Sequence, residues 1–186
     1  MAIETKENIL WAHAEEIEDP LTEWKRVREL WVAMCESGAK PELIEVAIGI
    51  IQNPLGEKLL LKRPSFDRSY PNEWCFPGGR REFLRIAGNI VGKEPLDVTV
   101  RRETFEETAL NTVVARKIAV RRAVQVKRGR LYVVHGYLLD VEGDPNAIQL
   151  SNEHTEYRYF PRESAPEGMG RVTRDMFSWE PSELIK

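Results

Sequence analysis

The chain has 186 residues, of which 42% are hydrophobic and 31% charged, and its formal net charge is −3 at pH 7. This length suits one domain with an added segment, and no apolar run approaches the ~20 residues that a membrane helix needs. The slightly negative charge argues against a general affinity for nucleic acid. The N-terminus has early acidic residues and no compact hydrophobic stretch, so we expect no signal peptide and a cytoplasmic location.

The chain contains only two cysteines, Cys35 and Cys75. Two cysteines in a chain of this kind make a disulfide framework or a zinc site a poor interpretation. We therefore expect two reduced and partly buried thiols.

Residues 1–42 are predicted to form a helical extension. Asp19 and Pro20 are typical of a helix start, with Asp as the N-cap and Pro at the first helical position, and Gly38 is a typical end. Apolar residues recur between them at helical spacing: Trp24, Val27, Trp31 and Met34. This stripe is expected to pack on the main domain or, alternatively, to form a homodimer contact. Residues 9–18 are a weaker helix candidate.

Residues 43–177 are predicted to form the main domain, followed by a tail at 178–186. Strand candidates are residues 45–51, 58–62, 115–126, 131–141 and 157–160. The first two are separated by turn residues and are predicted to pair as a hairpin. Helix candidates are residues 95–110 and 171–177. Strands on both sides of a central helix predict a mixed β-sheet with helices on its faces, in the α+β or α/β class.

The central helix carries three carboxylates, on Glu103, Glu106 and Glu107, at positions i, i+3 and i+4. This spacing places them on one face. The opposite face has an apolar stripe predicted to anchor the helix on a sheet: Val98, Phe105 and Ala109. Clustered carboxylates repel one another unless cations neutralise them, and Mg²⁺ shared with substrate phosphates does this well. The alternative interpretation is a solvated acidic helix face.

The wider spacing resembles the motif of the Nudix hydrolase family. The pattern reads Gly88, five residues, Glu94, seven residues, Arg102-Glu103, two residues, Glu106-Glu107 and then Leu110. Residues 74–79, Trp-Cys-Phe-Pro-Gly-Gly, also resemble the strand and glycine turn that precede this motif in the family. The resemblance covers residues 43–160. It implies an α/β/α sandwich with a mixed sheet and the hydrolysis of a diphosphate linkage.

The loop glycine of the motif has two candidates. The family has five residues between this glycine and the first glutamate, whereas 14 residues separate Gly79 from Glu94. Gly88 restores the spacing, but Gly79 follows the Pro-Gly pair that normally supplies the position. We favour Gly79, with residues 83–91 as an insertion at the rim of the cleft that shapes substrate choice. Two further departures, Thr104 for an aliphatic residue and Ala109 for the final glycine, remove no ligand, although a left-handed alanine costs about 1 kcal/mol.

The resemblance implies a role for each motif residue. Glu106 and Glu107 are the main ligands of Mg²⁺, which Mn²⁺ can replace. Glu103 is either a third ligand or the group that orients the attacking water. Arg102 holds these carboxylates in place, and the carbonyl of Gly79 completes the coordination.

Two acidic residues outside the helix are further candidates. Glu94 is expected to stabilise the loop or to contact the metal through water. Glu153 lies in a late loop that resembles one supplying another acidic ligand or a general base in the family. An ordinary polar loop residue is the alternative for Glu153. The neighbouring His154 is expected to be a loop hydrogen-bonder, because Mg²⁺ prefers oxygen ligands.

The substrate is predicted by elimination. In the family, a proline or a tyrosine downstream of the motif marks the ADP-ribose or dinucleoside polyphosphate groups, and residues 125–127 are Gln, Val and Lys. This favours a nucleoside triphosphate or another nucleoside diphosphate derivative. Three arginines are candidates for phosphate binding: Arg63, Arg80 and Arg81. Aromatic stacking on a base is expected from Phe66 or Tyr70, with Trp74 in the core.

A protein that binds nucleotide without turnover is the alternative function. A Nudix-fold sensor or regulator has no need for three mutually repelling carboxylates. The complete set of Arg102, Glu103, Glu106 and Glu107 therefore favours an active pyrophosphohydrolase.

Overall fold

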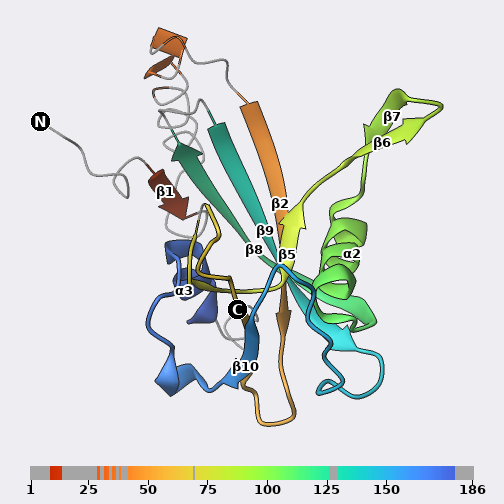
Figure 1. Ribbon diagram of the computed structural model, residues 1–186. Coiled ribbons are helices and arrows are strands. Elements are labelled where there is room, and N and C mark those ends of the chain that lie inside the picture. Colours follow the sequence, from red (N-terminus) through yellow and green to blue (C-terminus); the bar gives the residue numbers. More distant parts are fainter. Residues whose placement is uncertain are drawn as a thin grey trace, which may run out of the picture. The chain divides into compact units, whose positions relative to one another are not determined.

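The computed structural model describes residues 9–13, 42–68, 70–125 and 130–178, together with Glu29, residues 32–33 and 35–36, and Gly38. Its elements are shown in Figure 1. The chain divides into two compact units, one of residues 1–46 and 119–135 and the other of residues 47–118 and 136–186. Within the described part, no helix has the length and apolar character needed to cross a membrane.

The first unit contains strand β1 (Ile9–His13), which pairs antiparallel with the second half of β8 (Thr112–Gln125). The register places Ile9 opposite Gln125 and His13 opposite Arg121. The helix predicted from residue 9 is therefore wrong for residues 9–13, and residues 14–18 lie outside the described part. A short isolated helix is marginal in water, whereas an added edge strand gains a ladder of backbone hydrogen bonds.

The second half of the predicted N-terminal helix is partly described. Five residues there are helical: Glu29, Val32, Ala33, Cys35 and Glu36. Gly38 follows with a φ of 77°, and its N–H donates to the carbonyl of Cys35 at 3.0 Å. The thiol of Cys35 is free, as expected, but the residue is exposed, which corrects the prediction of partial burial. The residues of the apolar stripe, Trp24, Val27, Trp31 and Met34, lie outside the described residues, and the homodimer contact stays a prediction.

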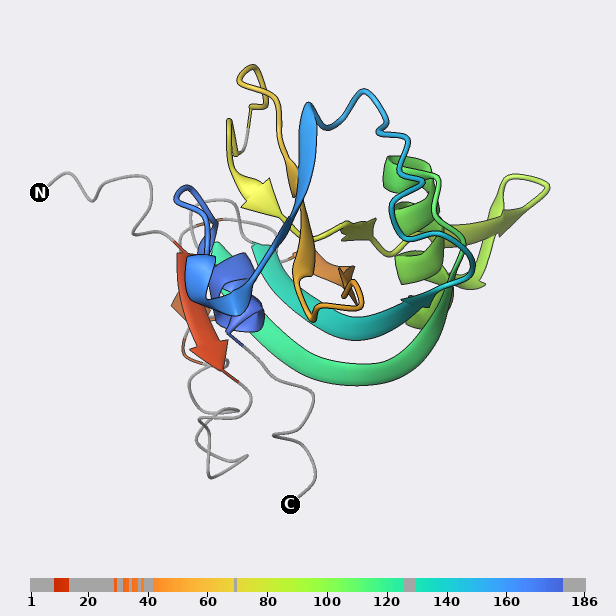
Figure 2. The same ribbon diagram turned by 90° about the horizontal axis from the view of Figure 1, so that it is seen from below.

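The described strands form three sheets. The largest has the order β1-β8-β9-β2-β5, in which β2 is Glu42–Ile51, β5 is Gly78–Arg80 and β9 is Arg130–Val141. The second has the order β10-β3-β4, with β10 at Glu156–Phe160, β3 at Lys58–Lys62 and β4 at Trp74–Cys75. β10 runs antiparallel along β3 (Figure 2). The third sheet is a separate hairpin, β6–β7.

The predicted hairpin between residues 45–51 and 58–62 is wrong in its pairing. The turn is present, because Gly56 N–H donates to the carbonyl of Asn53 at 2.9 Å. However, β2 and β3 enter different sheets and share only an isolated bridge between Gln52 and Lys58. β3 has both edges occupied, by β10 and β4, and its three leucines are fully buried. A strand buried on both faces has an unbroken apolar run, and Leu59, Leu60 and Leu61 form such a run in β3.

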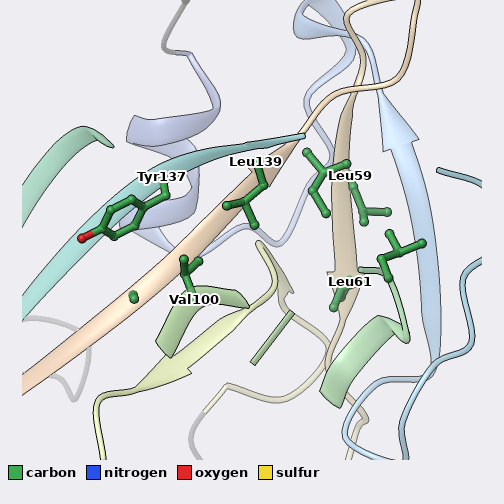
Figure 3. Packing of buried hydrophobic residues seen from close by; sticks show 8 residues of the cluster. Leu59, Leu61, Val100, Tyr137 and Leu139 are labelled. Carbon is green, nitrogen blue, oxygen red and sulfur yellow. The ribbon is translucent and has the colours of Figure 1, made fainter. Parts of the chain in front are cut away.

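The core of the second unit lies where β2, β3 and β9 meet helix α2 (Leu96–Thr108). Its buried cluster consists of Ala47, Ile51, Leu59, Leu61, Val100, Leu110, Tyr137 and Leu139. Figure 3 shows Val100 of α2 among leucines from β3 and β9. Each fully buried aliphatic side chain of this kind contributes about 1.5–3 kcal/mol. The cluster therefore fixes α2, the helix that carries the acidic motif.

α2 confirms the predicted helix at residues 95–110 within a residue or two at each end, and Ala109 has the left-handed φ of 58° anticipated for the helix end. The predicted anchoring stripe is wrong, because Val98 and Phe105 are 43% and 51% exposed. The helix instead buries a mostly polar face: Thr99, Val100, Thr104, Glu107 and Thr108. Threonine suits this face because its methyl group packs while its hydroxyl bonds internally; Thr108 Oγ1 donates to the carbonyl of Thr104 at 2.6 Å.

Residues 83–91, predicted as an insertion, form most of a hairpin of β6 (Phe83–Ile86) and β7 (Asn89–Lys93). Ala87 and Gly88 make the turn with φ values of 49° and 82°, the conformation of a two-residue hairpin loop. The large apolar side chains of the hairpin are all exposed: Phe83, Leu84, Ile86, Ile90 and Val91. The C-terminal helix α3 (Arg171–Phe177) matches the predicted closing helix.

Candidate active site

The glycine turn between β4 and β5 lies against the C-terminal half of α2. Gly78 has a φ of 146°, and a Cβ there would lie 2.3 Å from the carbonyl oxygen of Ala47. Only glycine fits this conformation and this close approach to β2. The turn directs the N–H of Gly78 to Glu107, where it donates to Oε2 at 2.8 Å. The helix and the turn are thus joined through a carboxylate.

The two candidate loop glycines have different surroundings. A Cβ on Gly79 would lie 2.3 Å from Cδ of Glu103, so the carboxylate rests directly on the glycine backbone. A Cβ on Gly88 would meet nothing within 4 Å, and this residue serves the hairpin turn. The geometry therefore supports Gly79 as the loop glycine, and the extra residues before Glu94 form the hairpin.

Arg102 connects the carboxylates of the motif. Its guanidinium binds Glu94 through two contacts of 3.0 Å and also lies 3.0 Å from Glu103 Oε1 and from Glu106 Oε2. A planar guanidinium suits this arrangement, because a lysine ammonium cannot present parallel donors to one carboxylate. The surrounding carboxylates, Glu94 above all, raise the pKa of Arg102, which keeps it charged.

Glu94 links the loop before α2 to the helix. Its carboxylate accepts from Arg102 and from Thr99 Oγ1 at 2.9 Å, and its N–H donates to the carbonyl of Glu82 at 2.9 Å. The hydrogen bond from Arg102 lowers the pKa of Glu94 most strongly. Both oxygens of the Glu94 carboxylate are therefore held by side chains of α2. The backbone hydrogen bond between Glu94 and Glu82 closes the base of the β6–β7 hairpin.

The three helical carboxylates differ in exposure. Glu107 is 5% exposed, whereas the side chains of Glu103 and Glu106 are 18% and 54% exposed. Burial raises the pKa of Glu107 to about 8, opposed by the Gly78 N–H and reinforced by Glu103 and Glu153. Burial also raises the pKa of Glu103, and Glu106 and Glu153 add to this. The common and largest cause is burial, which disfavours the charged form, and neighbouring carboxylates add to it.

Glu153 reaches the same region from the loop before β10. Backbone hydrogen bonds hold this loop to the end of α2: Gln149 N–H donates to Thr108 O at 2.9 Å, and Ser151 N–H donates to Glu107 O at 3.1 Å. Glu153 itself is exposed, and its charge raises the pKa values of Glu103 and Glu107. The loop therefore brings the predicted fourth carboxylate to the cluster.

His154 and Cys75 meet beside Glu107, and Cys75 is a free, partly buried thiol, as expected. The side chain of His154 is fully buried, with Nε2 3.8 Å from Glu107 Oε1 and 3.6 Å from Cys75 Sγ. Burial lowers the pKa of His154 to about 4 and raises that of Cys75 to about 12, so both are neutral near pH 7. A histidine directly beside acidic residues was the available signal, but its inward orientation depends on the loop.

Some of the residues predicted to bind substrate are exposed, whereas others are held by contacts within the protein. Arg63 is held by Asp67, with its Nη2 2.7 Å from Oδ2, and the Nε of Arg81 donates to the carbonyl of Glu94. Arg80 is exposed at the end of β5. Of the aromatic candidates for stacking on a base, Phe66 is 79% exposed and Tyr70 is 43% exposed. Trp74 is in the core, as expected, and packs edge-on against Phe160 at 4.9 Å between centroids.

The donor set suits a hard divalent cation. No group of three histidine, cysteine or acidic side chains in the described residues already has the spacing of a complete metal site. Glu103 and Glu107 nevertheless supply oxygen atoms at the glycine turn, and their raised pKa values indicate charge that a cation would neutralise. A Mg²⁺ ion that keeps several waters and shares substrate phosphates needs no closed protein cage.

Comparison with known proteins places this site in a family. The model of the NUDIX domain matches residues 43–179. The MutT protein from Methanosarcina mazei Go1 is 25% identical, with a TM-score of 0.62 over 79% of this chain and 99% of that chain. The MutT NUDIX hydrolase from Burkholderia pseudomallei is 21% identical, with a TM-score of 0.58 over 73% of this chain and 96% of that chain. The E. coli ORF135 protein is 24% identical, with a TM-score of 0.50 over 66% and 76%.

No curated protein sequence matches this chain. The solved structures confirm the predicted α/β/α sandwich with a mixed sheet, and the family model extends through α2, the glycine turn and the loop before β10. The acidic helix, the arginine that connects it and the glycine turn lie within the matched residues. The chain belongs to the Nudix hydrolase family and is a Nudix-type pyrophosphohydrolase.

Proposed function

We propose that this enzyme hydrolyses a diphosphate linkage in a nucleoside triphosphate or another nucleoside diphosphate derivative and depends on Mg²⁺, which Mn²⁺ can replace. The observation that carries the proposal is the convergence of Glu103 and Glu107 on the Gly78-Gly79 turn, where burial and like charge raise both pKa values. Clustered carboxylates that resist ionisation in the free protein are suited to binding a divalent cation.

Glu106 and Glu107 would hold the metal, together with the carbonyl of Gly79, and Glu103 would be either a third ligand or the group that acts on the attacking water. Bound there, the cation supplies neutralisation of phosphate charge and a water of lowered pKa. The protein fixes the ligands around it: Gly78 N–H holds one oxygen of Glu107, and Arg102 spans Glu103 and Glu106. Removing Arg102 would therefore release two of the three carboxylates.

A carboxylate of the cluster accepts the proton of the attacking water. The water oxygen bonds to phosphorus, the bridging P–O bond breaks, and its electron pair stays with the departing phosphate. Glu103 and Glu153 are the candidates for this base, and the raised pKa of Glu103 makes it the stronger one. Glu153 is exposed at the edge of the cluster and so is placed to meet a substrate arriving from solvent.

Substrate binding rests on exposed groups of the same unit. Phe66 and Tyr70 offer aromatic surface for a base, and Arg80 is the exposed arginine beside the glycine turn. Arg63 and Arg81 have protein partners and contribute to phosphate binding only if these contacts open. The absence of a proline or tyrosine mark at residues 125–127 supports a triphosphate over ADP-ribose or dinucleoside polyphosphates.

The test is phosphate and pyrophosphate release from a panel of nucleoside triphosphates, dinucleotides and nucleoside diphosphate sugars, with Mg²⁺, Mn²⁺ or excess EDTA. Reaction in ¹⁸O-labelled water identifies which phosphorus is attacked. We expect turnover of at least one triphosphate and none in EDTA. Turnover that is unchanged in EDTA contradicts the metal mechanism. Turnover confined to dinucleotides or sugars contradicts the preference for a triphosphate, and no turnover of any nucleotide in the panel contradicts the substrate class.

A further inference from the structure

The feature that the mechanism above leaves unused is the buried face of Glu107, where His154 and Cys75 meet. Glu107 Oε2 accepts the Gly78 N–H at 2.8 Å, but its Oε1 faces the ring of His154. The His154 side chain is fully buried and Glu107 is 5% exposed, so no bulk water separates them. A buried carboxylate held at one oxygen only is free to rotate unless its second oxygen is also held.

The loop places His154 there by backbone contacts at both ends. Ser151 N–H donates to the carbonyl of Glu107 itself at 3.1 Å, and Thr155 N–H donates to the carbonyl of Lys62 on β3 at 2.9 Å. The imidazole lies between these two attachments. Its position relative to Glu107 is therefore set by α2 and β3, not by the exposed part of the loop.

The surroundings of the ring decide where its proton lies. Nδ1 has no hydrogen-bond partner in the described part of the chain, whereas Nε2 faces Glu107 Oε1 at 3.8 Å and Cys75 Sγ at 3.6 Å. The Cys75 thiol lies 3.6 Å from the carbonyl of Leu61, an acceptor for its S–H. When Glu107 is ionised, as a metal ligand is, both groups at Nε2 are acceptors, and a neutral imidazole meets them by carrying its proton on Nε2.

We propose that His154, as the Nε2–H tautomer, is a positioning residue that holds the Oε1 side of Glu107 while the Gly78 N–H holds Oε2. At 3.8 Å the contact is electrostatic and longer than a hydrogen bond. A neutral donor suits a metal ligand, because it orients the carboxylate without cancelling the charge that attracts the cation. The inference rests on the proposed role of Glu107 as a metal ligand.

The test compares two substitutions of similar size, His154→Gln and His154→Leu. Glutamine keeps an N–H that reaches the place of Nε2, whereas leucine fills the space without a donor. The readout is Mn²⁺ affinity without substrate, by calorimetry or electron spin resonance, together with the midpoint of thermal unfolding. Loss of a partner of this kind costs about 10–100-fold in metal affinity. We expect that loss for leucine, a change below about 3-fold for glutamine, and kcat falling with metal affinity.

Equal Mn²⁺ affinity in the leucine variant and the wild type would overturn the proposal, as would equal losses in both variants. If the leucine variant does not fold, long-range ¹H–¹⁵N spectra of the wild type saturated with Mg²⁺, in which Glu107 is ionised, decide, with His154 assigned by its loss in the glutamine variant. An Nδ1–H tautomer there rejects the idea. A wild-type protein that hydrolyses nothing, but whose Mn²⁺ affinity falls as expected in the leucine variant, would refute the proposed function alone. A protein that hydrolyses nucleotides with Mg²⁺, but whose leucine variant binds Mn²⁺ normally, would refute this inference alone.

Discussion

Glu107→Gln tests two opposed effects of the buried Glu107 carboxylate: its charge lowers the stability of the metal-free protein but would bind the metal that turnover needs. The substitution keeps the shape of the side chain and leaves an oxygen that can accept the Gly78 N–H, as Glu107 Oε2 does in the wild type at 2.8 Å. It removes the charge that burial opposes in the metal-free protein and that a divalent cation would need. We therefore expect the variant to lose nearly all turnover and to be more stable than the wild type when no metal is present.

The magnitude follows from the pKa of Glu107, which burial raises from 4.5 to about 8. Above pH 4.5 the unfolded chain releases this proton while the folded protein keeps it, so the free energy of unfolding falls as pH rises towards 8. At about 1.4 kcal/mol for each pH unit, the penalty reaches ~3 kcal/mol at pH 7 as an upper limit. Below pH 4.5 the carboxylate is protonated in both states, and the penalty is absent.

The assay is urea unfolding of both proteins in EDTA between pH 4 and pH 8, and again at pH 7 with Mg²⁺. The advantage of the glutamine variant should grow through this window, and Mg²⁺ should stabilise only the wild type. Glu106→Gln is the matched control, because the Glu106 side chain is 54% exposed and its change should leave stability in EDTA nearly constant. A glutamine variant no more stable than the wild type at pH 8 would show that Glu107 is ionised without penalty, and the reasoning from burial would fail.

Three further predictions test the surroundings of this carboxylate. Gly79→Ala should lower kcat at least 10-fold, because its Cβ would lie 2.3 Å from Glu103 Cδ. Gly88→Ala should leave kcat unchanged and lower the free energy of unfolding by about 1 kcal/mol, because its φ is 82°. Equal losses of kcat in the two variants would refute the choice of Gly79 as the loop glycine. Arg102→Lys should reduce kcat at saturating Mg²⁺ about 10–100-fold, because lysine cannot bind Glu94 through two parallel contacts. A kcat equal to that of the wild type would mean that Arg102 forms only a surface ion pair and does not position the carboxylates. Ala109→Gly should raise the free energy of unfolding by about 1 kcal/mol, because φ is 58° there, with kcat constant; no change in a urea titration would contradict this.

The sequence predicted most elements because their patterns are local. β3 and α3 match their predicted residues, and α2 matches within a residue or two at each end. The wrong predictions concern which strands pair with each other. β1 was read as helix because the edge of β8, which makes it a strand, is more than 100 residues away. The predicted β2–β3 hairpin failed because β3 pairs with β10 on one edge and with β4 on the other, and β2 meets it only at the Gln52–Lys58 bridge.

The site shows the same division between local pattern and distant packing. Spacing alone brought Glu103, Glu106 and Glu107 to one side of α2, but only packing reveals that Glu107 is buried and Glu106 exposed. The pattern misled because Phe105 reads as an anchor and Thr104 as a departure from the family. The structure reverses this: Thr104 is fully buried and Phe105 is 51% exposed.

The polar buried face of α2 fits the proposed role of Glu107 as a metal ligand. A helix that anchored itself through Val98 and Phe105 would turn its opposite side, with Thr104 and Glu107, to solvent, and an exposed carboxylate binds a cation weakly against competing water. Because α2 buries Thr104 and Thr108 in place of larger apolar groups, Glu107 is buried with them. The raised pKa of Glu107 shows that burying its charged form costs stability. The metal-free protein is therefore expected to be the less stable form, and metal binding to contribute to the stability of the folded enzyme.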